Sequence, residues 1–135
     1  MSNWPAQALA QWHSMVAQGD LSALHSILHQ GVVFRSPVAH TPYPGAPMVA
    51  LILNTVAQVF TEFTYLRELA TEDGLSVVLE FSAYVNGKQL KGIDMLRFDQ
   101  TGKIVEFEVM LRPLNALQAL AAEMAQRLAA YLPSK

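Results

Sequence analysis

One acidic residue of this sequence lies where the pattern of side chains predicts a buried position. The segment 89–98 alternates like a β-strand, and Asp94 shares its more apolar face with Leu90, Gly92, Leu96 and Phe98. An ionised carboxylate on that face is costly unless it is paired. A buried carboxyl group with a raised pKa can donate a hydrogen bond to a carbonyl oxygen or an oxyanion. The alternative is a structural aspartate that bonds the backbone or an arginine.

Three other side chains have groups suited to ligand contact. His40 lies in the proline-rich segment 37–47, and an imidazole can act as a general base near neutral pH. Tyr43, in the same segment, is placed to close the mouth of a pocket. Trp12 combines a large apolar ring with an N–H donor. The alternatives are a solvated loop histidine, a tyrosine that packs the loop and an ordinary core tryptophan.

Two further histidines have a spacing that can bind a metal ion. His25 and His29 are four residues apart in a segment of helical periodicity, which can place two imidazoles on one metal. No third ligand follows nearby in the sequence, so an exposed helix face is the preferred interpretation. The sequence contains no cysteine, which excludes disulfides, thiolate ligands and a cysteine nucleophile. We therefore expect neither a metal site nor a cofactor.

The composition favours a globular domain with apolar surface to spare. The 135 residues suit one domain over 1–135. They are 52% hydrophobic and 15% charged, against roughly 25% charged in an average soluble domain. The net charge of −2 argues against a nucleic-acid partner. No apolar run approaches the ~20 residues of a membrane span, and the start lacks the pattern of a signal peptide, so we expect a cytoplasmic protein without membrane contact.

The periodicity of the apolar residues predicts helices first and strands later. The Asn86-Gly87 pair between two alternating runs is a strong hairpin signal. The order predicts an α+β fold, in which helices pack on one face of a curved antiparallel sheet and leave a cone-shaped cavity. The predicted helices cover 4–18, 21–30, 48–60 and 113–132, and the predicted strands cover 32–36, 63–71, 75–85, 89–98 and 103–111.

Two groups of motifs resemble the nuclear-transport-factor-2-like superfamily, in its SnoaL-like branch. The first is Gln18-Gly19-Asp20-Leu21, followed by 33–37 and Tyr43-Pro44-Gly45; the second is 92–98, followed by 101–104. The resemblance covers about residues 8–112, and the C-terminal helix 113–132 lies beyond it. This superfamily includes isomerases, epoxide hydrolases, cyclases, dehydratases and non-enzymatic binders, so the resemblance implies a fold more than a function.

The register is similar to that of ketosteroid isomerase. In that comparison Asp94 falls where the isomerase keeps a protonated oxyanion-hole aspartic acid. Trp12 falls at the position of the oxyanion-hole tyrosine, and its indole still donates through N–H. Ser36 falls at the position of the aspartate base, and a hydroxyl does not abstract a proton unaided at neutral pH. The resemblance therefore implies a site that has lost its base, and ketosteroid isomerase activity is not expected.

The comparison with limonene epoxide hydrolase implies that the residues of that enzyme's mechanism are missing as well. The positions of its arginine and two aspartates are taken here by Val77, Leu79 and Val109, so no carboxylate pair remains to position water. We expect the pocket to be lined instead by apolar side chains of the sheet, together with three residues from the N-terminal half. The expected ligand-binding residues are Trp12, Ser36, Tyr43, Leu79, Phe81, Phe107 and Val109.

These residues leave two main hypotheses for function. The first is a non-catalytic module that binds a small, largely apolar, carbonyl-bearing molecule, which Asp94 orients; the missing base favours this one. The second is an isomerase, cyclase or dehydratase, in which Asp94 assisted by Trp12 stabilises negative charge and His40 or water moves the proton. A third is a structural protein with a filled cone. The superfamily commonly pairs through the outer face of its sheet, so the resemblance implies a homodimer. The helix 113–132 either caps the cone or contributes to that contact.

Overall fold

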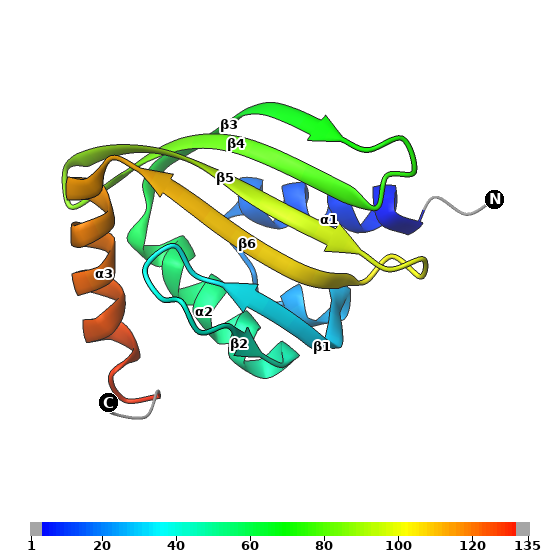
Figure 1. The fold of residues 1–135 in the computed structure, drawn as a ribbon, viewed down its shortest axis with the longest axis horizontal. Coiled ribbons are helices and arrows are strands. Elements are labelled where there is room, and N and C mark those ends of the chain that lie inside the picture. The colour runs from blue at the N-terminus through cyan, green and yellow to red at the C-terminus, as the bar shows by residue number, and fades with distance from the viewer. Residues whose placement is uncertain (1–3, 132–135) are drawn as a thin grey trace.

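The computed structural model describes residues 4–131, and it places the helices on the concave side of one curved sheet (Figure 1). The sheet has six strands in the order β2-β1-β6-β5-β4-β3. All neighbours are antiparallel except β1 and β6, which run parallel. The elements are α1 (Trp4–Gln18), the 3₁₀ helix η1 (Leu24–Ile27), β1 (Leu28–Arg35), β2 (Tyr43–Pro44), α2 (Ala46–Val59), β3 (Thr61–Ala70), β4 (Ser76–Val85), β5 (Lys88–Phe98), β6 (Ile104–Arg112) and α3 (Leu114–Leu128). The predicted α+β class with its curved sheet and C-terminal helix is confirmed, and the sheet is mixed where the prediction was antiparallel.

The second predicted helix is largely wrong. The chain forms only the short η1 there, and β1 already begins at Leu28, which pairs with Ile104 of β6. The apolar residues Leu21, Leu24 and Ile27 are three apart, a spacing that fits a 3₁₀ turn as well as an α-helix. The residues from Leu28 onward join the sheet because they pair in parallel with β6. The local sequence cannot reveal this pairing.

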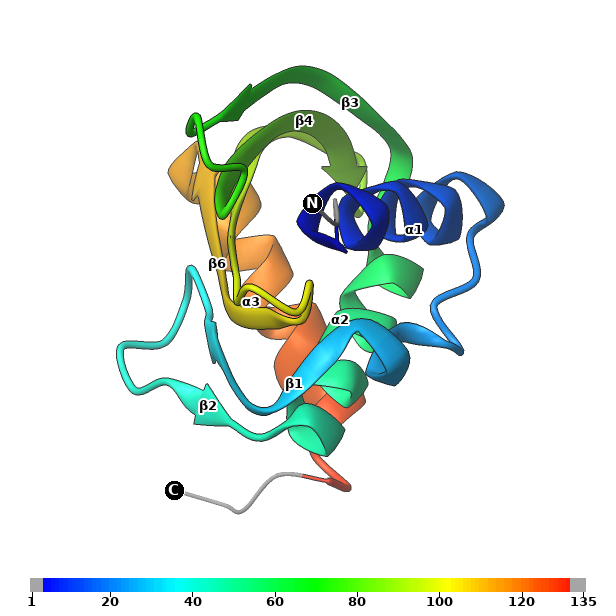
Figure 2. The same ribbon diagram turned by 90° about the vertical axis from the view of Figure 1, so that its right-hand side faces the viewer.

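The strong curvature of the sheet originates in irregular pairing. The register of β3 against β4 shifts between Thr61 and Thr64 and again between Tyr65 and Glu68, and Glu62 has a positive φ of 51°. Such bulges bend a strand and increase its twist. Figure 2 shows the result: the strands follow an arc from β3 through β4 and β6 to β1, and α1 and α2 close its open side.

A bulge in β6 decides which of its side chains face the helices. Strict alternation predicts that Val105 shares the inward face with Phe107. The register instead shifts, so that Arg97 pairs with Glu106 but Phe98 pairs with Ile104. Val105 is the extra residue. Ile104 is therefore fully buried, and Val105 is only half-buried.

The hairpin between β4 and β5 is confirmed and sets the level of Asp94. Asn86 and Gly87 have φ angles of 49° and 78°, which suit the two-residue turns that match the twist of the strands. The regular register that follows places Asp94 opposite Leu79 of β4 and Val109 of β6. All three side chains point to the concave face. No helix within residues 4–131 is long and apolar enough to cross a membrane.

Candidate functional site

A cavity of about 540 Å³ lies between the concave face of the sheet and the three α-helices. Its walls come from α1, β1, the loop that follows β1, α2, the start of β3, β5, β6 and α3. Nearly all of the lining is aliphatic or aromatic. Asp94 is the single acidic or basic residue among the described lining residues, and Ser36 and Tyr43 add hydroxyl groups. The cavity is thus an apolar container with very few polar contacts to offer.

Six of the residues predicted for the site do line this cavity: Asp94, Trp12, Ser36, Tyr43, Phe107 and Val109. Three do not, namely Leu79, Phe81 and His40, and their prediction is corrected. Leu79 and Phe81 point to the concave face but are fully buried in the core. Phe63 stacks on Phe81 with ring centroids 4.8 Å apart and separates it from the cavity. The curvature of β3, which brings Phe63 over its neighbour, is the physical reason.

The predicted base is also corrected. His40 is exposed on the loop between β1 and β2, and it is not part of the cavity wall. Its neighbours Val38 and Ala39 line the cavity instead. Ser36 Oγ accepts a hydrogen bond from the backbone N–H of Val38 at 3.1 Å, so this loop turns its backbone and small side chains to the cavity and its imidazole to solvent.

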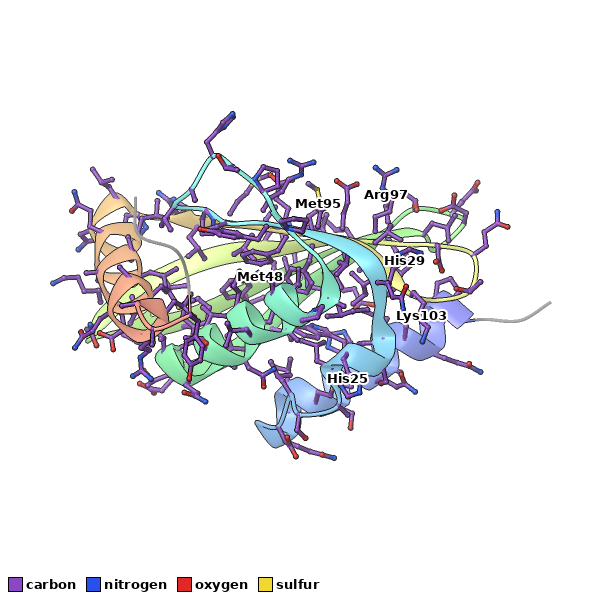
Figure 3. All side chains as sticks on the ribbon, turned by 90° about the horizontal axis from the view of Figure 1, so that it is seen from below. His25, His29, Met48, Met95, Arg97 and Lys103 are labelled. Carbon is purple, nitrogen blue, oxygen red and sulfur yellow. The ribbon has the colours of Figure 1, made fainter. Side chains whose placement is uncertain are left out.

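The two histidines considered for a metal site are not on one helix face. His25 belongs to η1 and His29 to β1. Figure 3 shows the two residues at separate places on the ribbon. His29 Nδ1 accepts the backbone N–H of Gly31 at 2.9 Å. Within the part of the chain that the structure describes, no three side chains of histidine, aspartate or glutamate gather in a group that can hold a metal ion.

Asp94 is buried, with 5% of its surface exposed, and has one strong partner. The hydroxyl of Tyr65 donates to Oδ2 of Asp94 at 2.7 Å. Burial raises the pKa of Asp94 to about 7, and the bond from Tyr65 partly offsets this rise because it favours the ionised form. Near neutral pH the group is therefore divided between a neutral acid and a carboxylate.

Trp12 acts on Asp94 through Tyr65. Its indole N–H donates to the Tyr65 hydroxyl at 2.8 Å, so the N–H that the sequence suggested for a ligand is already used inside the protein. The ring itself still lines the cavity, edge-on to Phe107 with centroids 5.2 Å apart. Trp12, Tyr65 and Asp94 thus form a chain of hydrogen bonds that ends at the cavity.

Tyr65 is the functional residue that the sequence analysis missed. It is half-buried in β3 and makes an edge contact with Phe63, with centroids 4.8 Å apart. A signal was present: Phe63 and Tyr65 alternate on one face of a predicted strand whose other residues are mostly polar. What the sequence did not reveal was the partner of its hydroxyl, which lies two strands away.

Helix α3 covers the cavity. Its side chains Leu120, Met124 and Leu128 contribute to the wall, and Glu123 on the same helix accepts a hydrogen bond from Asn86 of the β4–β5 turn at 3.2 Å. Arg127 of the same helix forms an ion pair with Glu123, with its Nε 3.0 Å from Oε1. The question that the sequence left open is thereby answered in part, because the inner face of α3 caps the cone.

A comparison with protein families identifies the fold. Residues 9–107 match the family model of the SnoaL-like domain. The chain belongs to the SnoaL-like family. The match begins within α1, covers α2 and the strands β1 to β5, and ends within β6, before α3. A comparison with curated proteins gives no significant match.

Several solved structures resemble this SnoaL-like chain. A steroid delta-isomerase from Pseudomonas aeruginosa is 57% identical, with a TM-score of 0.93 over 99% of this chain and 98% of the other. A protein with a cystatin-like fold from Silicibacter pomeroyi is 33% identical, with a TM-score of 0.86 over 92% and 86%. An epoxide hydrolase/cyclase-like enzyme of pyran ring formation in salinomycin is 19% identical, with a TM-score of 0.66 over 83% and 92%. At this low identity, the likeness to the epoxide hydrolase/cyclase-like enzyme shows a shared fold alone.

Proposed function

We propose that this protein binds a small, largely apolar molecule bearing a carbonyl or similar oxygen, and that it does so without a complete catalytic set. The observation that carries the proposal is the position of Asp94, the single acid among the described residues of a largely apolar cavity wall. Small-molecule sites commonly measure about 300–1,000 Å³ and combine apolar walls with a few placed polar groups. The cavity of about 540 Å³ has this character.

The same geometry argues against proton-transfer chemistry in the cavity. An enzyme that moves a proton needs a base within hydrogen-bond reach of the ligand. The described wall offers no second carboxylate and no imidazole to act as the base while Asp94 holds the ligand oxygen, because His40 is exposed. Ser36 occupies the place where the resemblance to ketosteroid isomerase implies a base, and its hydroxyl is not basic enough for that role. Binding is therefore the function that the site supports best.

Calorimetric titration with progesterone, a steroid enone, tests this proposal. We expect binding with a negative heat-capacity change, because apolar surface is buried. Ala121→Phe should abolish it, since Ala121 lines the cavity and a larger ring would fill the space. Ala122→Phe is the matched control, because Ala122 is exposed on the same helix. Equal heats from the two variants would show that the ligand binds elsewhere.

A second candidate is an isomerase, and one observation favours it. The Pseudomonas aeruginosa protein described as a steroid delta-isomerase is 57% identical over nearly the whole chain. In this alternative Asp94 donates to the ligand oxygen as a neutral acid and water moves the proton. Incubation with a β,γ-unsaturated steroid ketone decides between the two, because the conjugated product absorbs in the ultraviolet. Conversion by the wild type that Asp94→Ala abolishes would establish the enzyme.

We also propose that two copies pair through the outer face of the sheet. Met110 is 44% exposed there, beside the half-buried Ile93 and Met95. Figure 3 shows Met95 and Arg97 on the side of the sheet away from α2. Ion pairs flank this apolar centre, with Lys91 on Glu80 at 2.9 Å at one end, and an apolar centre with a polar rim is typical of an interface.

Light scattering tests the pairing. Met110→Glu should convert a dimer to a monomer, because it buries a charge at the centre of the contact. Leu114→Glu is the control, since Leu114 is 68% exposed on α3 and lies off the sheet face. A wild-type protein that is monomeric at high concentration would exclude the dimer.

A further inference from the structure

The hydrogen bonds in the chain from Trp12 to Asp94 run in one direction, from the indole through the phenol to the carboxyl group. An indole N–H can only donate, so the Tyr65 hydroxyl must accept at the 2.8 Å contact with Trp12. The single proton of that hydroxyl is then free for Oδ2 of Asp94, 2.7 Å away. Burial and the neighbouring Asp94 raise the pKa of Tyr65 far above its ordinary value, so the phenol keeps its proton. A hydroxyl oxygen can accept two hydrogen bonds, but if it also accepted from Asp94, its own proton would have no acceptor among the described hydrogen bonds. Tyr65 is thus a donor to Asp94.

This direction determines where neutral Asp94 carries its own proton. A proton on Oδ2 would face the proton of Tyr65, so it must lie on Oδ1. No fully buried side-chain oxygen among the described residues lacks a hydrogen-bond partner. Oδ1 has no protein partner among the described hydrogen bonds, so it must have access to open space. The space beside Asp94 is the cavity that it lines.

We propose that Trp12 and Tyr65 are positioning residues that make Oδ1 of neutral Asp94 a hydrogen-bond donor to the cavity. The site then selects ligands with an acceptor oxygen near Oδ1 over ligands with an N–H or O–H donor there. This inference rests on the proposed binding function and names its ligand class. A donor ligand would meet the Asp94 proton and leave two unpaired groups, which costs more than a missing bond. Ionisation of Asp94 reverses the preference, because a carboxylate only accepts.

The surroundings of Asp94 contain few other groups that titrate. Its strand neighbours Leu79 and Val109 are apolar, and Tyr43 is the other titratable residue of the described cavity wall. On the far side of Tyr65, His13 of α1 packs edge-on against the phenol ring and holds Glu68 of β3 at 2.8 Å. Among the described residues, this pair is the nearest other ion pair to Tyr65, so His13→Gln serves as a control.

Three tricyclic probes of nearly the same shape isolate the hydrogen bond. Fluorenone carries a carbonyl acceptor, carbazole carries an N–H donor at the corresponding position, and fluorene carries neither. None of them titrates between about pH 5 and about pH 9, the range on either side of the pKa of about 7 of Asp94. Their dissociation constants are measured by fluorescence or calorimetry at both ends of this range. Fluorene reports the integrity of the cavity in every variant.

At about pH 5 the wild type should bind fluorenone roughly threefold to tenfold more tightly than fluorene, the usual size of one hydrogen bond. Carbazole should bind no more tightly than fluorene. At about pH 9 the order of fluorenone and carbazole should reverse. Asp94→Asn should keep the low-pH order at both ends, because its carbonyl accepts from Tyr65 and its NH₂ then faces the cavity. The reversal should persist in His13→Gln, which removes the competing titration.

Tyr65→Phe and Trp12→Phe test the positioning role. Without the fixed donor, neutral Asp94 can present either oxygen to the cavity, so discrimination between fluorenone and carbazole should fall to within about twofold. Fluorene affinity should stay close to that of the wild type in Tyr65→Phe. In Trp12→Phe, which changes a residue of the cavity wall, the other two affinities are compared with that of fluorene in the same variant. Two variants are used because each substitution also changes packing. If both fail to fold, Asp94→Asn still tests the inference.

Three outcomes overturn the inference. The first is carbazole binding as tightly as fluorenone to the wild type at about pH 5. The second is unchanged discrimination in Tyr65→Phe with normal fluorene binding, which would reduce Tyr65 to a structural residue. The third is a low-pH order in Asp94→Asn opposite to that of the wild type. Failure of all three probes to bind would overturn the proposed function as well, and it is distinguishable because fluorene itself would not bind.

Discussion

Tyr65 donates a hydrogen bond to Asp94 across an entire intervening strand. Tyr65 lies on β3 and Asp94 on β5, with β4 between them. Strands are spaced about 4.8 Å apart, so the two backbones of a flat sheet would be about 10 Å apart with their side chains parallel. The bond of 2.7 Å forms because the sheet is concave and the side chains converge. The bulges of β3 on either side of Tyr65 are therefore part of the site.

The raised pKa of Asp94 makes stability depend on pH. The ordinary pKa is 3.8 and the folded value is about 7, so between these values the folded state binds more protons than the unfolded state. Stability therefore falls as pH rises through this window. Asp94→Asn removes the titration, and we expect its free energy of unfolding, relative to the wild type, to increase by about 4 kcal/mol from about pH 4 to about pH 8. Urea denaturation at several pH values measures this difference. Parallel curves for the two proteins would show that Asp94 is not buried as an acid.

Gly92 is required by close packing on β5. A Cβ at this position would lie 2.5 Å from the carbonyl oxygen of Met110 and 2.9 Å from Cζ of Phe81. Gly92→Ala should therefore cost about 1–3 kcal/mol of stability through overpacking. The control is Gly31→Ala, where the nearest atom, in His29, is 3.5 Å away. Chemical denaturation compares the two, and a similar loss in both variants would contradict the packing argument.

Leu120 ties α3 to the wall of the cavity. It is 3% exposed, and Leu120→Ala should destabilise the protein by about 2–3 kcal/mol because it enlarges an existing space. Leu114→Ala on the same helix should change stability by less than about 0.5 kcal/mol, since Leu114 is 68% exposed. Thermal unfolding distinguishes them. Equal effects would mean that α3 does not pack against the cavity in solution.

His40 should be dispensable for binding. Its side chain is exposed and lies outside the cavity wall, so His40→Ala should change the affinity for progesterone by less than about twofold, as expected for a surface substitution. The same titration used for Ala121→Phe measures it. A loss of tenfold or more would show that the loop carries the imidazole to the ligand and would reopen the enzyme hypothesis.

Much of the fold followed from local patterns in the sequence. The Asn86-Gly87 turn and the alternation of β4 and β5 predicted the central hairpin and the inward position of Asp94, because both depend on neighbouring residues. The helix over Ala46–Val59 was predicted nearly to its ends. The segment that becomes η1 and the start of β1 was not, because pairing of Leu28 with Ile104 depends on a contact far along the chain.

The candidate site could likewise be predicted from the sequence only in part. The sequence by itself determined that an acid lies on an apolar strand face, since alternation is a local property. The resemblance to ketosteroid isomerase implied that the usual base is missing. Only the tertiary structure decided which groups meet Asp94. Curvature of the sheet brought Tyr65 to it, the hydroxyl of Tyr65 accepted the N–H of Trp12, and Phe63 stacked on Phe81. These are consequences of how strands bend and stack, and they depend on contacts between residues that are distant in the chain.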